Sequence, residues 1–567
     1  MSATVLIEGN VVDAVSIKIG VRSATFDARD GFVLNGVKVY LKGTSNHLGF
    51  GGVGMAVPDR VAEFQIATLR RMGSNAWRTA HNPVAPEMLD LADRYGLLVW
   101  SENRFITSGV QPIASLRRQR PEDAAAAFTP DKPVDPPDAR LLRDAQDMVL
   151  RDRNHPSIVI WSLCNELGCV ANDEDGHFRA AAFKRVIYEA DQSRPITGNT
   201  VQTPYLSGAF VDAFSQMMDV QSFSYEPEVM PLYHAQAPWK AVGNGEAGAC
   251  PSDRGYYGET NPRAGHVSPA EKGGQPIAIP GVFACAAASW NVSGSLRYSF
   301  GAFVWTGFDY IGETYPLGWP DVSSHYGMHD LAGFAKDSVG YYTAWWRDAD
   351  ATTSECANLD SVDLWIAPSD WTQPVPVGTP VDVFVSTCAA SVELFVNGAR
   401  QGRSQPVPRL GYALWPSVVF EPGNITAVGY SPSGRVLASR TILTAQQPSR
   451  LRAWVEDIYV SRNGTVIAAD GQDVAIIGVA LEDANGILVP DADVNVTFTI
   501  IEGPAVVIAV ANGDPADHSP FHATWRLTFH GLARAFIASS GASQKGSIII
   551  RASAANVQQA EVRVVAQ

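Results

Sequence analysis

The sequence has 567 residues, of which 46% are hydrophobic, and this is the composition of a globular protein too long for a single core. Its 43 Lys and Arg against 58 Asp and Glu give a formal net charge of −15, which argues against a nucleic-acid-binding protein. No apolar run reaches the roughly 18 residues of a membrane span, and the N-terminal segment lacks the layout of a signal peptide. We therefore expect no nucleic-acid partner and no membrane partner, and the compartment stays unknown. A secreted or periplasmic protein stays open if the N-terminus is truncated.

Residues 1–33 have a β-type pattern, and from about residue 34 to residue 350 short apolar runs alternate with helical patterns. One such helix starts at Pro58 and places Val61, Phe64 and Leu69 on one face. The eight runs that we expect to form strands are 37–43, 74–79, 96–102, 157–163, 195–199, 219–225, 239–246 and 301–309. Strands that alternate with helices form a parallel sheet, and eight of them favour a closed TIM barrel. An open doubly wound sheet is the alternative, but no GxGxxG motif follows the first run.

From about residue 351 the hydrophobic pattern changes to a period of two, which is typical of antiparallel strands. VDVFVST and SVELFVNG are two such runs, and Asn397-Gly398 is a hairpin turn signal. A second series of runs begins after TAQQPSR at 444–450. We expect two immunoglobulin-like β-sandwiches, at 351–447 and 448–567.

The six cysteines have neither CxxC spacing nor the spacing of a zinc site. Their positions are 164, 169, 250, 285, 356 and 388. This pattern predicts free buried thiols rather than a disulfide framework.

The candidate catalytic residues lie at the carboxyl ends of the predicted strands, where such barrels carry their active sites. The fourth strand ends in Asn165 and Glu166, and the seventh ends in Glu246. Two carboxylates across a barrel mouth are what glycoside hydrolysis needs, one as the acid and one as the nucleophile. The other candidates at strand ends are Asn46, His47, Arg78, His81, Glu102, Tyr225, Trp305 and Asp309. Each alone could be structural, as a salt-bridge partner, a satisfied histidine or a core aromatic, but the set is more specific than any member.

Several segments resemble glycoside hydrolase family 2. DGFVLNGVKVYLKGTSNH (30–47) resembles the first part of its barrel, RDRNHPSIVIWSLCNE (151–166) its acid/base signature, and GNGEAGACPSDRGYY (243–257) its nucleophile segment. FVWTGFDYIGE (303–313) is similar to the β-galactosidase-type branch, which carries extra C-terminal sandwich domains.

The resemblance implies a retaining glycoside hydrolase that removes a terminal β-linked sugar by double displacement. Glu166 would be the general acid/base and Glu246 the nucleophile, with Asn165 on the sugar 2-hydroxyl. Arg78 and Tyr225 would hold Glu246 ionised, and the expected sugar contacts are His47, His81 and Trp305. Gly245 stands where the family usually has Ser or Thr, which we expect to loosen that strand end. Ser224 replaces a frequent Asn.

The same resemblance indicates which cofactor and which sugar to expect. The segment WSENRF lacks the Glu-x-His pair with which some β-galactosidases hold magnesium, so we expect no metal site and no cofactor. The Asn-x-Lys motif of β-glucuronidases is not evident before Gly327, which makes β-D-galactose the leading sugar in a small carbohydrate substrate. A β-glucuronidase, another exo-glycosidase of the family and a non-catalytic carbohydrate-binding remnant stay open.

Family members begin with a jelly-roll domain and a complete sandwich, whereas residues 1–33 resemble only the end of that sandwich. We therefore expect a truncated enzyme, half of a split enzyme or an incomplete gene model, with weak activity alone. Its unpaired apolar strands would favour a homo-oligomer or a separate N-terminal domain chain as partner.

Overall fold

The structure is a computed structural model. It describes residues 1–103, 139–166, 174–200, 213–256, 266–267, 277–278, 282–315, 317–349, 355–372, 375–459 and 463–567.

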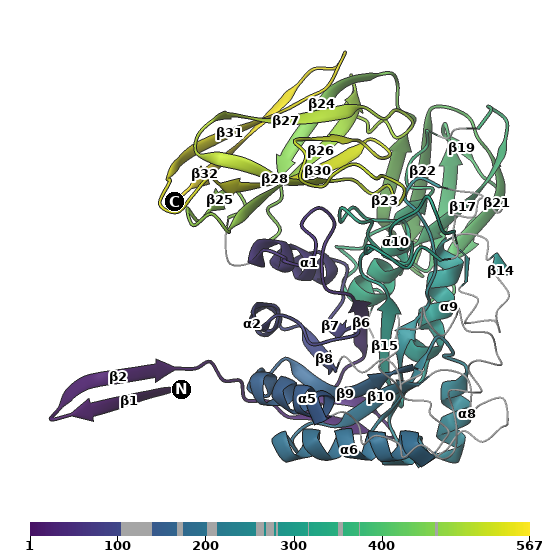
Figure 1. The fold of residues 1–567 in the computed structure, drawn as a ribbon. Coiled ribbons are helices and arrows are strands. Elements are labelled where there is room, and N and C mark those ends of the chain that lie inside the picture. The colour runs from purple at the N-terminus through teal and green to yellow at the C-terminus, as the bar shows by residue number, and fades with distance from the viewer. Residues whose placement is uncertain are drawn as a thin grey trace, which may run out of the picture.

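Eight parallel strands close into a barrel, which confirms the TIM-barrel prediction (Figure 1). In chain order they are β6 (Leu41–Asn46), β7 (Ala76–Thr79), β8 (Leu98–Glu102), β9 (Ile158–Asn165), β10 (Ile196–Thr200), β11 (Gln221–Ser224), β12 (Val242–Ala247) and β15 (Ser299–Trp305). Each strand pairs with the next, and β15 pairs with β6 to complete the circle. β9 and β12 are buried along their whole length, as expected for strands that face side chains on both sides.

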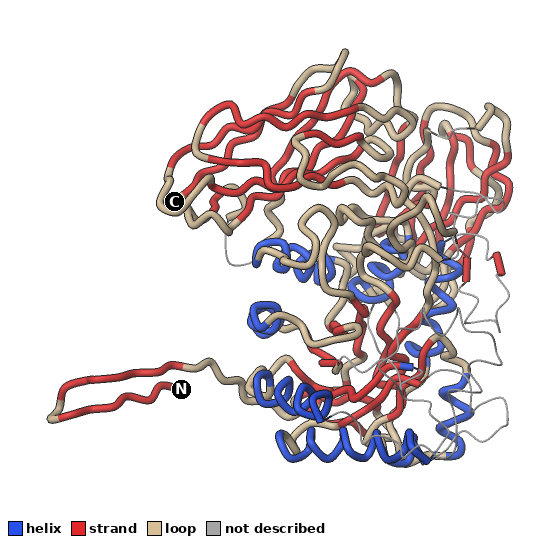
Figure 2. Tube along the Cα trace, in the orientation of Figure 1, coloured by secondary structure: helices blue, strands red, loops and turns tan. Residues whose placement is uncertain are grey.

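Helices cover the outside of the barrel (Figure 2). They are α1 (Asp59–Arg71), α2 (Pro86–Tyr95), α5 (Ala139–Asp152), α6 (Glu174–Ala190), α7 (Ala213–Met217), α8 (Val229–Gln236), α9 (Val282–Ser295) and α10 (Ser338–Tyr342), and α10 continues as the π-helical segment η4 (Thr343–Asp348). In α1 the predicted face of Val61, Phe64 and Leu69 is buried. α2 ends at Gly96, whose φ of 64° is the left-handed conformation that closes many helices. No helix in the described ranges is both long and apolar enough to cross a bilayer.

The N-terminal residues form two small sheets. β1 (Ser2–Ile7) and β2 (Asn10–Ser16) pair as a hairpin that projects away from the barrel (Figure 1). Its apolar side chains are exposed. β3 (Ala24–Asp27), β4 (Gly31–Leu34) and β5 (Val37–Lys38) form a second sheet, in which Phe26 and Phe32 join a core cluster with Phe300 of β15. The predicted start of the first barrel strand at residue 37 is wrong, because β5 pairs with β4 and the barrel strand begins only at Leu41.

Two β-sandwiches follow the barrel. In the first, one sheet contains β16 (Trp365–Ala367), β17 (Pro380–Ser386) and β21 (Ala413–Val419), and the other contains β18 (Ser391–Val396), β19 (Ala399–Arg400), β20 (Gln405–Pro406), β22 (Asn424–Tyr430) and β23 (Val436–Leu443). The turn between β18 and β19 has positive φ at both Asn397 and Gly398, as the hairpin signal predicted.

The second sandwich has a four-stranded and a five-stranded sheet, with a hydrophobic core separate from that of the first. The four-stranded sheet contains β24 (Pro448–Val455), β26 (Val474–Asp483), β30 (Leu532–Ser539) and β28 (Ala505–Ala511). The five-stranded sheet contains β25 (Val466–Ile467), β32 (Ala560–Ala566), β31 (Gly546–Ser553), β27 (Asn495–Glu502) and β29 (Trp525–Leu527). A two-stranded pair, β13 (His266–Val267) and β14 (Ile277–Ala278), lies between β12 and α9 in the sequence.

The last sandwich is fixed to the barrel by buried cations. Arg60 of α1 is 2% exposed, and it forms an ion pair of 2.6 Å with Asp473 and donates to the carbonyl of Val466. Arg254, which follows β12, forms an ion pair of 3.0 Å with Asp330 and donates to backbone carbonyls at Phe529 and His530. The segments that follow β12 and β15 are therefore held from the outside by this sandwich.

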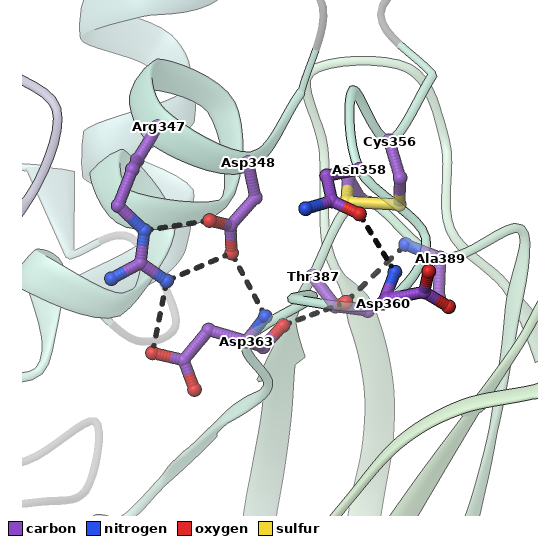
Figure 3. Close-up of a disulfide and its surroundings, with 9 residues drawn as sticks. Arg347, Asp348, Cys356, Asn358, Asp360, Asp363, Thr387 and Ala389 are labelled. Atoms are coloured by element: carbon purple, nitrogen blue, oxygen red, sulfur yellow. Dashed lines mark hydrogen bonds and ion pairs between the residues drawn. A yellow bond between two sulfur atoms is a disulfide. The ribbon is translucent and has the colours of Figure 1, made fainter.

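The prediction of free thiols is wrong. Cys250 is bonded to Cys285 and Cys356 to Cys388, and every cysteine that the structure describes is in a disulfide. Figure 3 shows the second bond beside an ion network in which Arg347 contacts Asp348 and Asp363. Partners 35 and 32 residues apart carry no spacing motif, so only the folded chain brings them together.

Candidate active site

The predicted site residues meet at the carboxyl ends of the barrel strands. Glu246 near the end of β12 is 1% exposed. Arg78 Nη1 donates to its Oε1 over 2.7 Å, and the hydroxyl of Tyr225 donates to its Oε2 over 2.7 Å. Asn199 Nδ2 donates to Oε1 over 3.3 Å, and His81 Nε2 lies 3.8 Å from the same atom. Both oxygens of Glu246 therefore accept hydrogen bonds, and the guanidinium group of Arg78 contacts one of them.

Arg78 is the fully buried centre of the cluster. Its Nε and Nη2 donate to both oxygens of Glu102 over 3.0 and 2.9 Å, and its Nη2 also donates to Asn165 Oδ1 over 2.7 Å. Burial alone would lower the pKa of Arg78, but the charges of Glu102 and Glu246 raise it. Burial alone would raise the pKa of Glu102, but Arg78 and His81 hold it below its ordinary value. The guanidinium group is thus shared among two carboxylates and one amide.

Glu166 follows β9 in a different environment. Its φ of 42° is a left-handed conformation that non-glycine residues rarely adopt and that clusters at functional sites. Burial raises the pKa of Glu166 to about 8, and the charge of Glu246 contributes in the same direction. Arg78 and a hydrogen bond with Ser224 oppose this shift. The carboxyl group of Glu166 is therefore mostly protonated at neutral pH, which suits a general acid.

An amide and hydroxyl network orients the residues between the two carboxyl groups. Asn165 Oδ1 accepts from Arg78 and, over 3.2 Å, from Asn199 Nδ2. Asn199 Oδ1 accepts from Ser222 Oγ over 2.8 Å, and its Nδ2 donates to Ser224 Oγ over 2.6 Å. With its oxygen turned to Arg78, Asn165 has its amide donor left for a ligand, since no described residue accepts from it.

The end of β12 is tightly held, so the expectation that Gly245 loosens it is wrong. The carbonyl of Gly245 accepts from Ser45 Oγ over 3.0 Å and from Arg78 Nη1 over 3.2 Å. A Cβ at this position would lie 2.3 Å from Asn199 Oδ1 and 2.9 Å from Trp100, so a larger residue would displace these side chains.

An aromatic group lies beside Glu246. The rings of His81 and Trp305 stack with centroids 5.1 Å apart, and His47 contacts both edge-on. His81 Nδ1 bonds Glu102 over 2.8 Å, which fixes that ring. Burial lowers the pKa of His47 to about 3, so this imidazole is neutral. Trp305 is 2% exposed, and its side chain supports the two histidines.

Two strand-end residues have structural partners. Asn46 Oδ1 accepts from the backbone of Gly307 over 3.1 Å, and Asp309 forms an ion pair of 2.6 Å with Lys336. Sequence reasoning missed Asn199, although its position at the end of the fifth strand followed the same rule as the other candidates.

Three side chains in the described ranges could together hold a metal ion, Asp90, Asp93 and His155. Asp90 and Asp93 lie on α2, and His155 precedes β9, at the amino end of that strand. His155 Nδ1 already bonds Asp93 over 2.8 Å. This group is therefore separate from the carboxyl ends where Glu246 lies.

Comparisons with known proteins identify the relatives of this chain. A family model described as the TIM barrel domain of glycosyl hydrolases family 2 matches residues 27–240. A model described as glycoside hydrolase family 2 C-terminal domain 5 matches residues 458–563, and a domain of unknown function matches residues 378–438.

A β-galactosidase of Bacteroides ovatus is 29% identical over 98% of this chain and 65% of its own length. A putative β-glucuronidase of Formosa agariphila is 27% identical over 97% of this chain and 51% of its own length. The chain thus spans about half to two thirds of these relatives. The crystal structure of a β-glycosidase from Bacteroides vulgatus has a TM-score of 0.79 at 25% identity, covering 100% of this chain and 69% of that chain.

Proposed function

The chain belongs to glycoside hydrolase family 2, and we propose that it is a retaining β-glycosidase that removes a terminal β-D-galactose by double displacement. The observation that carries this proposal is the contrast between the two carboxyl groups. Glu246 is held by a cation and by donors on both oxygens, whereas burial raises the pKa of Glu166 to about 8. One group is prepared to attack and the other to give a proton.

In the first step Glu166 donates its proton to the glycosidic oxygen while an oxygen of Glu246 bonds to the anomeric carbon. The bond to the leaving group breaks, and the aglycone departs as an alcohol. The negative charge of Glu246 is lost in the ester, so one cause of the raised pKa of Glu166 disappears. In the second step Glu166 can therefore accept a proton from water, which attacks the anomeric carbon and releases Glu246.

The substrate assignment rests on charge. A glucuronide carries a carboxylate at the position where a galactoside carries a hydroxymethyl group, and a carboxylate needs a cation in its site. Arg78, the cation bonded to Glu246, already contacts Glu102 and Asn165. This favours a neutral sugar, while the names of relatives such as the Formosa agariphila protein keep a β-glucuronidase as the second candidate.

The first test is a screen of the purified protein against aryl β-galactoside, β-glucuronide, β-mannoside and β-glucoside. Hydrolysis of the galactoside at the highest kcat/KM supports the proposal. Turnover of none of them would contradict the proposal and favour a non-catalytic remnant, with or without carbohydrate binding.

The second test assigns the two carboxyl groups. Glu246→Gln should abolish covalent labelling by a 2-fluoro glycosyl inhibitor, and labelling of a peptide without Glu246 would contradict the assignment. Glu166→Ala should slow substrates with poor leaving groups most, and azide should partly restore its activity. Glu421→Gln, an exposed carboxylate in the first sandwich, is the matched control and should behave as the wild type.

The stereochemistry gives a third test. A retaining enzyme releases the β-anomer of the sugar first, which proton NMR follows during the early reaction. Release of the α-anomer first would overturn double displacement.

A further inference from the structure

A further acidic residue, Glu313, lies on the segment after β15, within electrostatic range of Glu166 and Glu246. The hydroxyl of Tyr310 donates to Glu313 Oε2. The ring of Tyr310 lies 4.4 Å from that of His47 and 5.9 Å from that of Trp305, between ring centroids. Through Tyr310, Glu313 is therefore connected to the aromatic group beside Glu246.

The backbone that carries Glu313 is fixed. Ile311 and Ser323 form an antiparallel bridge, the N–H of Gly312 donates to Val322 over 2.8 Å, and the N–H of Ser324 donates to Tyr310 over 2.8 Å. Glu313 itself has a φ of 48°, the left-handed conformation that persists only where the surroundings enforce it. The residue as a whole is exposed, whereas its carboxyl group lies among neighbours that desolvate it.

Electrostatic interactions link Glu313 to both catalytic candidates. Neighbouring groups desolvate its carboxyl group and raise its pKa, the bond from Tyr310 opposes this shift, and the charge of Glu246 adds to it. In the other direction, the charge of Glu313 helps to raise the pKa values of Glu166 and Tyr225. The charge of Glu313 therefore affects the ionisation of Glu166 and Tyr225, and the charge of Glu246 affects that of Glu313.

Among the described residues, the opposite charge that acts on Glu313 comes from His81, which lowers its pKa less than desolvation raises it. No ion pair joins Glu313 to a Lys or Arg within the described ranges. Arg78 is bonded to two carboxylates, and Lys336 is paired with Asp309 over 2.6 Å. A ligand that brings a further carboxylate here meets repulsion, whereas a ligand hydroxyl can donate to Glu313.

We propose that Glu313 is a specificity-determining residue that accepts a hydrogen bond from a neutral hexopyranoside and repels a hexuronide. This inference rests on the proposed glycosidase function and extends it to the choice of sugar. The two sugars differ in one group, a hydroxymethyl or a carboxylate, and like charges placed together in a recognition site strongly disfavour the wrong partner.

The experiment compares kcat/KM for an aryl β-galactoside and an aryl β-glucuronide with the same aglycone. Glu313→Gln keeps the size of the side chain and removes its charge. We expect it to lower kcat/KM for the galactoside, because a charged acceptor is lost, and to raise the glucuronide-to-galactoside ratio by about tenfold or more.

Three further variants show whether the charge itself is responsible. Glu313→Asp keeps the charge, so its ratio should stay near that of the wild type. Tyr310→Phe frees the carboxylate but keeps the charge, so the ratio should change less than in Glu313→Gln. Glu421→Gln, far along the chain in the first sandwich, should change neither constant.

The glucuronide-to-galactoside ratio of kcat/KM tests the role of Glu313 separately from the proposed glycosidase function. A wild type that hydrolyses galactosides, with a Glu313→Gln ratio within about twofold of its own, overturns the inference and leaves the proposed function standing. A wild type that prefers the glucuronide also overturns it. A folded wild type that hydrolyses no glycoside overturns the proposed function, and the inference with it. If Glu313 had a structural role alone, Glu313→Gln would lower kcat/KM for both sugars by the same factor. That result would also count against the proposal.

Discussion

The raised pKa of Glu166 should fall when Glu246 loses its charge. Burial is the largest cause of the shift from 4.5 to about 8, and the charge of Glu246 is the next. Glu246→Gln removes this charge with little change of shape. It also frees the charge of Arg78, which lowers the pKa of Glu166 further.

The size of the effect follows from the geometry that the mechanism requires. Two unit charges about 5.5 Å apart, as in retaining glycosidases, repel by about 3 kcal/mol at an effective dielectric constant near 20. At 1.36 kcal/mol per pKa unit, this is about two units. We therefore expect the pKa of Glu166 to be about 6 in Glu246→Gln, and the remaining upward shift is the effect of burial partly offset by Arg78 and Ser224.

The assay is an NMR titration of protein labelled with ¹³C at the glutamate carboxyl carbons, with Glu246→Gln/Glu166→Gln as the variant that assigns the signal. In the wild type, Glu166 acts in its protonated form, so kcat/KM should fall as the pH rises through about 8. A pKa in Glu246→Gln within half a unit of the wild-type value would refute the reasoning, because burial alone would then set it.

Three further predictions concern the framework of the site. Arg78→Lys should lower kcat about 100-fold or more with little change in fold, because an ammonium group cannot form the bidentate contacts of a guanidinium, and a near-normal kcat would contradict this. Replacing both Cys250 and Cys285 by Ser should lower the free energy of unfolding by about 3–4 kcal/mol, given their separation of 35 residues, and a thiol assay of the unfolded, unreduced wild type should detect neither cysteine. Arg60→Met should destabilise the last sandwich by about 3 kcal/mol in urea unfolding, because it leaves a partly buried carboxylate without its cation, while the exposed Arg71→Met should have little effect.

The barrel and the location of its site follow from local features of the sequence. Alternating apolar runs and helical patterns are local properties, and in a parallel barrel every strand must end at the same face. Glu166, Glu246, Arg78 and Tyr225 could therefore be selected from their positions after strands, before any contact was known. The same rule applied to the fifth strand would have included Asn199.

Which of these side chains contact one another depends on how the whole chain packs. The sharing of Arg78 among two carboxylates and an amide, and the close approach of Asn199 to Gly245, depend on the register in which eight strands close. The disulfide of Cys250 and the connection of Glu313 to Tyr310 and His47 depend on how loops return to the barrel. Periodicity records whether a residue faces a core or solvent, but it carries no information about which distant segment lies opposite. That choice is made by the packing of the whole chain.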